Sequence, residues 1–211
     1  MKSITRHIAC FCENTFDAQV PESADLAEDP AVEAQILAGD FMAVSCPVCG
    51  KRLTPEFPFR LTGVRGVGEL FLVPEAQRTA FLREKLDYPL GTPARVVVGF
   101  AELAEKVLIF SKGLDDRVIE IMKYYLLTGP AGGSAQGAER DVTFLYRGEE
   151  GDKHLFHILG MKEGEVGVAR LARAIYDKIA SDVEKRVKEE PFRDFCEPPW
   201  VSLRRVGGGA A

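Results

Sequence analysis

Two cysteine pairs are the residues in this chain whose chemistry can be read most directly. Cys46 and Cys49 stand in the stretch SCPVCGK, with a proline between the thiols and a glycine directly after them. The proline stiffens a turn, and the glycine lets the chain leave the turn without a Cβ clash. Cys10 and Cys12, in HIACFCEN, supply a second pair. Two turns that each offer two sulfurs are what a tetrahedral four-thiolate metal site requires.

Zinc is the metal that four thiolates favour, and the competing interpretations of the pairs have less support. A redox pair is typically followed by a helix, whereas Cys49 precedes a stretch marked by prolines. Unrelated buried thiols are the remaining alternative. The single residue between Cys10 and Cys12 is a tighter spacing than most zinc turns have, so His7 is the reserve ligand. Four protein ligands leave no position for water or substrate, which predicts a structural zinc ion and no catalytic residue.

Other residues that could do chemistry have simpler explanations. Cys196 stands alone and is expected to be a buried small apolar side chain. His154 and His157 are three apart in an expected strand, so they should point to opposite faces. Asp115 is placed to cap a helix, and this explains it and the acidic residues after it better than a catalytic carboxylate site does.

Composition excludes some classes of protein. The chain has 211 residues, a formal net charge of −5 and five cysteines. The charge argues against general nucleic-acid binding, because basic surface supplies most of that affinity. The sequence shows neither a run of about 20 apolar residues nor a secretory leader, so we expect no membrane segment and a cytoplasmic location. Cytosolic thiols stay reduced, which favours metal binding over disulfides.

The elements that must position the cysteines suggest an α+β fold. Residues 4–73 read as two zinc-ribbon-like strand–turn–strand units with a short helix inserted between them, and 52–63 is expected as one strand. A short buried strand rich in valine is expected at 94–100, and a helical hairpin follows, with one helix near 101–113 and the next near 114–129. We expect a flexible linker at 129–140, then a β-hairpin and a helix over about 167–189, packed on the first part within 141–205, and a disordered tail at 206–211.

Several motifs together resemble a known family. The stretch SCPVCGKRL is preceded by DPAVEAQILAGDF, and ELAEKVLIFSKGLDDRVIEIMKYYL follows later. In these stretches the chain resembles the bacterial CpXC domain family over residues 4–126. The resemblance implies a CpXC-like domain at 1–128, with Cys10, Cys12, Cys46 and Cys49 as zinc ligands. It implies no reaction.

The sequence therefore predicts a cytoplasmic protein with structural Zn²⁺ that acts through a protein partner rather than as an enzyme. It identifies neither the partner nor the oligomeric state. Two alternatives remain open: an enzyme with its site in the C-terminal half, and a thiol redox sensor that uses Cys10 and Cys12.

Overall fold

The computed structural model describes residues 1–129 and 142–207 and confirms the mixed α+β class. The chain divides into two compact units, Met1–Val107 and Leu108–Ala211, and the boundary falls within one helix. The linker predicted at 129–140 lies almost wholly outside the described residues, as does the end of the tail predicted at 206–211. Among the described helices, none combines the length and the apolar character needed to cross a membrane.

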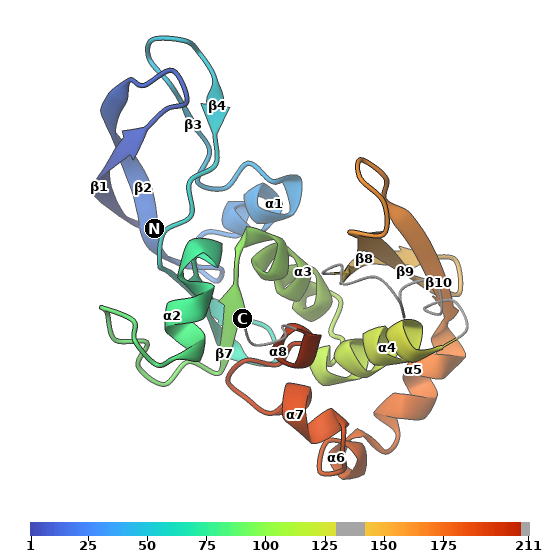
Figure 1. Ribbon diagram of the computed structural model, residues 1–211. Helices are drawn as coiled ribbons and strands as arrows, with labels where there is room; N and C mark the ends of the chain where they lie inside the picture. Colours follow the sequence, from blue (N-terminus) through green and yellow to red (C-terminus); the bar gives the residue numbers. More distant parts are fainter. Residues whose placement is uncertain (130–141, 208–211) are drawn as a thin grey trace. The chain divides into compact units, whose positions relative to one another are not determined.

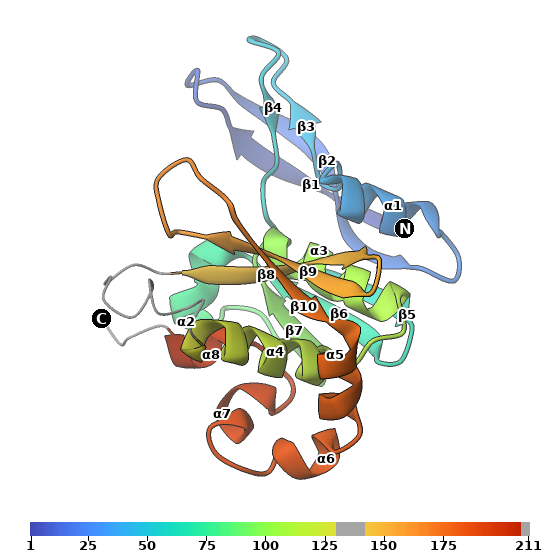
Figure 2. The same ribbon diagram turned by 90° about the vertical axis from the view of Figure 1, so that its right-hand side faces the viewer.

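The first unit is built on a mixed five-stranded sheet, ordered β1-β2-β5-β6-β7 (Figures 1 and 2). Its strands are β1 Lys2–Ala9, β2 Thr15–Asp25, β5 Phe59–Val64, β6 Gly68–Val73 and β7 Arg95–Val98. The pairs β1–β2 and β5–β6 are antiparallel, whereas β2–β5 and β6–β7 are parallel. β7 is a run of valines that are completely buried, which suits a strand covered on both faces. Only the end of β2 pairs with β5, so the other end of β2 extends past the sheet together with β1.

Helices of the first unit are short except for the last. They are α1 Ala31–Ala38, the 3-10 turn η1 Glu75–Gln77, α2 Arg78–Leu82 and α3 Phe100–Ser111. Val32 and Ile36 of α1 are fully buried, and the ring of Phe41, just after α1, meets Phe59 edge-on at 4.8 Å between centroids. α1 and the β5 strand therefore share one apolar core.

The segment between Arg52 and Gly63, predicted as one strand, is interrupted. β4 covers only Arg52–Leu53, and β5 begins at Phe59. Between them, the Glu56 carboxylate accepts hydrogen bonds from the backbone N–H groups of Glu75 and Phe100, at 2.6 Å each. Glu56 thus caps the first residues of η1 and α3, and the residues around it do not continue the pairing of β4 with another strand.

A second, very short hairpin completes the first unit. β3 Val44–Ser45 pairs with β4 over two residues each. In Figures 1 and 2 its loop lies beside the loop that joins β1 to β2. The expected strand–turn–strand arrangement is present, but a zinc ribbon is not confirmed, because β1 and β2 belong to the larger sheet and β3–β4 is only a minimal ladder.

One glycine fixes the register of the large sheet. Gly63 has a φ of 71° at the irregularity between β5 and β6. A Cβ at this position would lie 2.6 Å from Oδ1 of Asp25, at the end of β2. Glycine at this position therefore allows both the left-handed backbone and the close approach of the end of β2.

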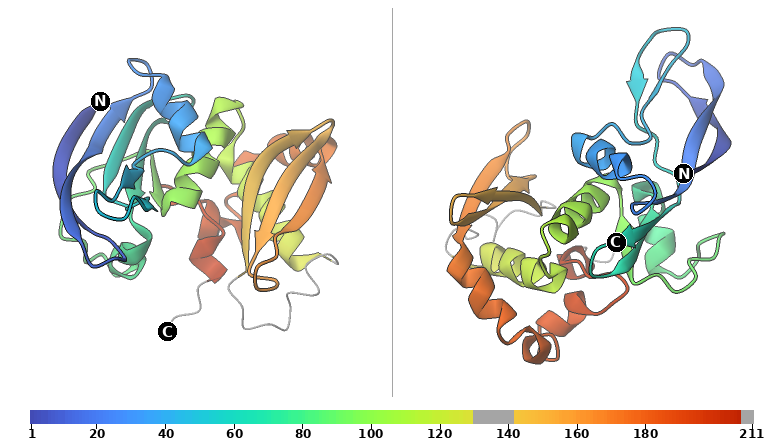
Figure 3. Two further views of the ribbon diagram at one scale, coloured as in Figure 1. Left: turned by 90° about the horizontal axis from the view of Figure 1, so that it is seen from above. Right: turned by 180° about the vertical axis from the view of Figure 1, so that it is seen from behind.

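The second unit combines a three-stranded sheet with helices (Figure 3). Its strands are β8 Thr143–Glu150, β9 Lys153–Leu159 and β10 Gly167–Ala172, in the order β10-β9-β8. Its helices are α4 Asp116–Thr128, α5 Arg173–Ala180, α6 Val183–Arg186, α7 Phe192–Cys196 and α8 Arg204–Gly207. The first two residues of the tail expected at 206–211 therefore end a helical turn.

A strand trio replaces the strand pair that was predicted. The long helix expected over 167–189 begins only at Arg173, because residues 167–172 pair antiparallel with β9. The helix then stops at Ala180, and a separate turn of helix follows from Val183.

Aromatic side chains dominate the packing around α4. The ring of Tyr124 stacks on that of Phe195, with 5.7 Å between the ring centroids.

Candidate metal centre

The first cysteine turn closes the β1–β2 hairpin. Cys10 N–H donates to the carbonyl of Asn14 at 2.8 Å, and Glu13 N–H donates to the carbonyl of Cys10 at 2.9 Å. Glu13 adopts a left-handed φ of 67°, which lets the chain reverse within three residues. Cys10 is buried and Cys12 is exposed.

The second turn has the same construction at the β3–β4 hairpin. Cys46 N–H donates to the carbonyl of Lys51 at 2.9 Å, and Gly50 N–H donates to the carbonyl of Cys46 at 3.0 Å. Gly50 takes the left-handed conformation with a φ of 69°, as its place in the sequence predicts. Again the first cysteine is buried, while Cys49 is exposed. We call the two turns, residues 10–14 and 46–51, the cysteine tip.

The four sulfurs converge between the two turns. Every pair of Sγ atoms lies within 4.8 Å, which is close enough to hold a metal ion. The contacts cross from one turn to the other: Cys10 Sγ is 3.6 Å from Cys49 Sγ, and Cys12 Sγ is 3.7 Å from Cys46 Sγ. Sulfurs at the usual zinc bond length of about 2.3 Å in a tetrahedron lie about 3.8 Å apart. The donor set and its spacing therefore fit zinc, and the one-residue spacing does not keep Cys10 away.

The surroundings shift the pKa values of the two buried cysteines in opposite directions. The N–H of Cys49, and after it that of Val48, lower the pKa of Cys46 to about 6 against the opposing effect of burial. The pKa of Cys10 rises to about 12: the N–H of Cys12 lowers it, but burial and contacts with the other three sulfurs outweigh that effect. The backbone N–H groups therefore favour a thiolate at Cys46, whereas burial and the neighbouring sulfurs oppose one at Cys10.

A small apolar cluster lies beneath the tip. Its buried members are Ile8, Cys10, Val20, Cys46 and Leu53. Two of these five are the buried cysteines, so the site and the core of this region are the same structure. Five partly buried residues pack against it: Ile4, Phe16, Ala18, Val44 and Phe57. A small core of this kind is the circumstance in which small domains use a metal.

His7 lies away from the four sulfurs. Its backbone pairs with Asp17, and its Nδ1 is 2.9 Å from Oδ1 of Asp17. Sequence reasoning did not identify Asn14, whose side-chain amide donates to Cys46 Sγ at 3.9 Å. Its position, two residues after a cysteine pair at a turn, could have indicated this role, because asparagine side chains commonly form hydrogen bonds within turns.

The other candidate residues have the structural roles expected of them. Cys196 is 1% exposed, and its Sγ lies 3.8 Å from the carbonyl of Arg117. His154 is buried while His157, on the opposite face of β9, is partly exposed. Asp115 caps α4 by accepting a hydrogen bond from Arg117 N–H at 2.9 Å.

Comparison with known proteins places these features in a family. The CpXC protein family matches residues 8–123, a span that contains all four clustered cysteines. A protein of Treponema pallidum (strain Nichols), named only as an uncharacterized protein, is 26% identical over 216 residues, covering 94% of this chain and 97% of that one. No solved structure matches. Because the family covers more than half of the chain, the protein belongs to the CpXC family.

Proposed function

We propose that Cys10, Cys12, Cys46 and Cys49 hold one structural Zn²⁺ ion, and that the protein acts by binding a partner protein in the cytoplasm. The observation that carries the metal assignment is the convergence of four sulfurs within 4.8 Å. Thiolates kept available for metal suit a reducing compartment. Four thiolates would close the coordination shell, which argues against catalysis at this metal.

The surface of the cysteine tip supports an interaction role. Phe11 stands between the first two cysteines and is 82% exposed, and Val48 stands between the second two and is 71% exposed. The ammonium of Lys51 lies 4.3 Å from the centre of the Phe11 ring, an interaction that favours one position for the ring. Large apolar side chains that are held rigidly in solvent are typical anchors of protein interfaces.

Photo-crosslinking in the native cell tests this role. A photoreactive phenylalanine analogue at position 48 should capture a defined protein, and Phe11→Ser in the same chain should abolish that product. The same analogue at Leu82, which is 56% exposed in the same unit, is the matched control. The proposal fails if positions 48 and 82 give the same products, or if Phe11→Ser leaves the product of position 48 unchanged.

A further inference from the structure

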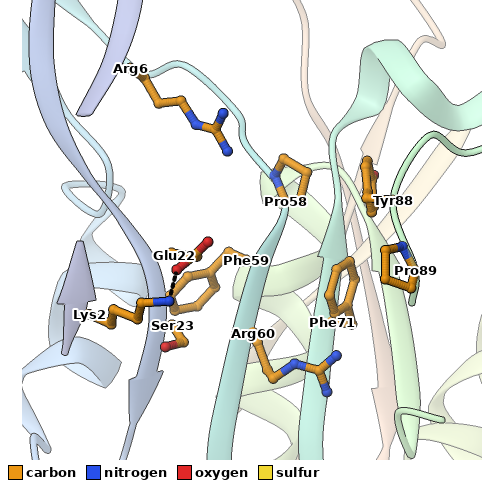
Figure 4. Close-up of a pocket in the computed structure, with 10 residues that line it drawn as sticks. All are labelled: Lys2, Arg6, Glu22, Ser23, Pro58, Phe59, Arg60, Phe71, Tyr88 and Pro89. Carbon is orange, nitrogen blue, oxygen red and sulfur yellow. Dashed lines mark ion pairs between the residues drawn. The ribbon is translucent and has the colours of Figure 1, made fainter. Parts of the chain in front are cut away.

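A pocket lies in the first unit and contains none of the four clustered cysteines. Its volume is about 380 Å³, which is within the range of small-molecule sites. Figure 4 shows it between the β1–β2 hairpin and the strands β5 and β6. Its apolar wall includes Phe71 and Tyr88, whose rings stack with their centroids 6.1 Å apart and 27° between their planes. Phe71 is itself only 6% exposed and carries the Arg60 guanidinium over its ring at 5.1 Å, so Tyr88, Pro58 and Pro89 are the more exposed apolar lining.

Positive side chains predominate on the rest of the lining. The lining contains three cationic side chains, Lys2, Arg6 and Arg60, and one carboxylate, Glu22. Lys2 Nζ lies 2.6 Å from Glu22, and Arg60 is paired with Glu69 and donates to the carbonyl of Leu90 at 3.0 Å. The hydrogen bond from Lys2, its charge and the more distant charge of Arg6 lower the pKa of Glu22. The pocket is therefore a local cationic site on a protein that is acidic overall.

Arg6 differs from the other two cations because it has no carboxylate within ion-pair distance among residues 1–129 and 142–207. Its Nε atom is buried and has no hydrogen-bond partner in the same part of the chain. The guanidinium stacks on Phe57, with Cζ 5.5 Å from the ring centre. Stacking occupies the face of the group and, because Nε is buried, leaves the terminal N–H groups as the donors that could meet a ligand. In Figure 4 the side chain reaches from β1 toward Pro58.

The pattern of β1 makes the position of Arg6 unusual. Residues alternate between the faces of a strand, so Arg6 shares a face with Ile4 and Ile8. Ile8 is buried in the cluster beneath the cysteine tip, and Ile4 packs against it. A charged residue between two inward apolar ones breaks the pattern that packing alone would favour, and such breaks are expected at functional positions.

Tyr88 contributes a ring without adding negative charge. Its hydroxyl donates to Oε1 of Gln77 at 2.6 Å, which holds the ring in place. Burial, and then the charge of Asp87, raise the pKa of Tyr88 to about 12, so the phenol is neutral at physiological pH. A bound anion would meet no phenolate.

We propose that this pocket binds a small molecule with a carboxylate or phosphate group on a flat apolar body, with the anionic group held by the edge of the Arg6 guanidinium and the body against Tyr88. The planar fork of arginine fits the two oxygens of either anion. The ring of Tyr88, backed by Phe71, supplies a surface for a flat body. This site is independent of the metal and of the function proposed for the cysteine tip.

Binding by the full chain, purified under reducing conditions, can be measured by calorimetry and ligand-observed NMR. The probes are indole-3-acetate, its neutral amide indole-3-acetamide, and phenyl phosphate. At least one of the two anions should bind at least tenfold more tightly than the amide, and the comparison between them identifies which anionic group the site prefers. Arg6→Gln should weaken its binding by roughly tenfold or more, the usual scale for a hydrogen bond to a charged group. Arg83→Gln, at an exposed position outside the pocket, should change nothing.

A gain of affinity distinguishes binding from damage to the fold. Glu22→Gln removes the competing carboxylate and releases Lys2, so anion affinity should rise several-fold, which a misfolded variant would not show. Arg6→Lys keeps the charge but loses the fork, and should bind with intermediate affinity. Failure of both anions to bind more tightly than the amide, full anion binding by Arg6→Gln, or no anion binding at millimolar concentration would each overturn the proposal.

Discussion

The cysteine tip and the core of the second unit differ in what packs inside them. The cluster beneath the tip has five buried residues, of which two are cysteines, and its aromatic members, Phe16 and Phe57, are only partly buried. In the second unit, by contrast, Tyr124, Phe192 and Phe195 pack ring against ring with centroids 5.6 to 6.0 Å apart. The comparison leads us to expect that the proposed metal holds the tip, that burial of large side chains holds the second unit, and that the two regions fail under different conditions.

The largest expected effect is the loss of the tip in Cys46→Ser. A structural zinc site contributes on the order of 10 kcal/mol to the folding of small zinc peptides. Here the neighbouring sheet should survive, so the damage should be local. Hydrogen exchange followed by mass spectrometry should show lost protection in residues 8–14 and 44–53, with the second unit unchanged.

Cys196→Ser is the matched control for this loss. Cys196 is as buried as Cys46 but lies in the second unit, away from any clustered thiol. We expect a cost of about 0.5–3 kcal/mol, typical of a single substitution, and normal protection of the tip. Identical exchange patterns in the two serine variants would remove the special role assigned to Cys46.

Phe195→Ala should have the next largest effect, in the other region. Phe195 is fully buried in the aromatic cluster, and such truncations cost about 3–5 kcal/mol. The single tryptophan, Trp200, is also buried in the second unit and reports its unfolding in denaturant by fluorescence. The destabilisation should be the same with and without a zinc chelator. If chelation alone shifted the Trp200 transition as far as this substitution, the two regions would not be stabilised separately.

A smaller effect should distinguish the regions by their response to acid. Burial lowers the pKa of His154 below its ordinary 6.5, more than the nearby Glu149 raises it. Below pH 6.5 the unfolded chain therefore takes up a proton that the folded unit resists, and stability falls as the pH falls toward the folded-state pKa. His154→Gln should flatten the dependence of Trp200 unfolding between pH 7 and pH 5. An unchanged slope in this variant would mean that other groups account for the acid sensitivity.

Local sequence signals predicted the parts of the fold that depend on local interactions. The valines of β7, the cap at Asp115 and the left-handed Gly50 were all expected from neighbouring residues, and all are present. The cysteine turns were equally visible. That the sulfurs of both turns meet at one point depends on how two separate hairpins lie together, and spacing alone could not establish that for Cys10.

The errors came from interactions between distant residues. Leu171 and Ile175 have helical spacing, which predicted one helix from residue 167 onward. Leu171 instead pairs with His154 of the preceding strand, β9, and the spacing of apolar residues does not show this cross-strand pairing. Arg6 is a similar case: the break in the alternation of β1 is visible in the sequence, but the pocket beside it is formed by residues up to Pro89.

Protection of the two exposed thiols tests the central claim, a zinc ion held by four cysteines, most directly. Cys12 and Cys49 are exposed, so an alkylating reagent should reach them at once unless a metal binds them. Protein purified under reducing conditions should contain one zinc per chain, and both thiols should resist alkylation until a chelator removes the metal. Immediate alkylation of Cys12 and Cys49 in native protein that contains no metal would contradict the account.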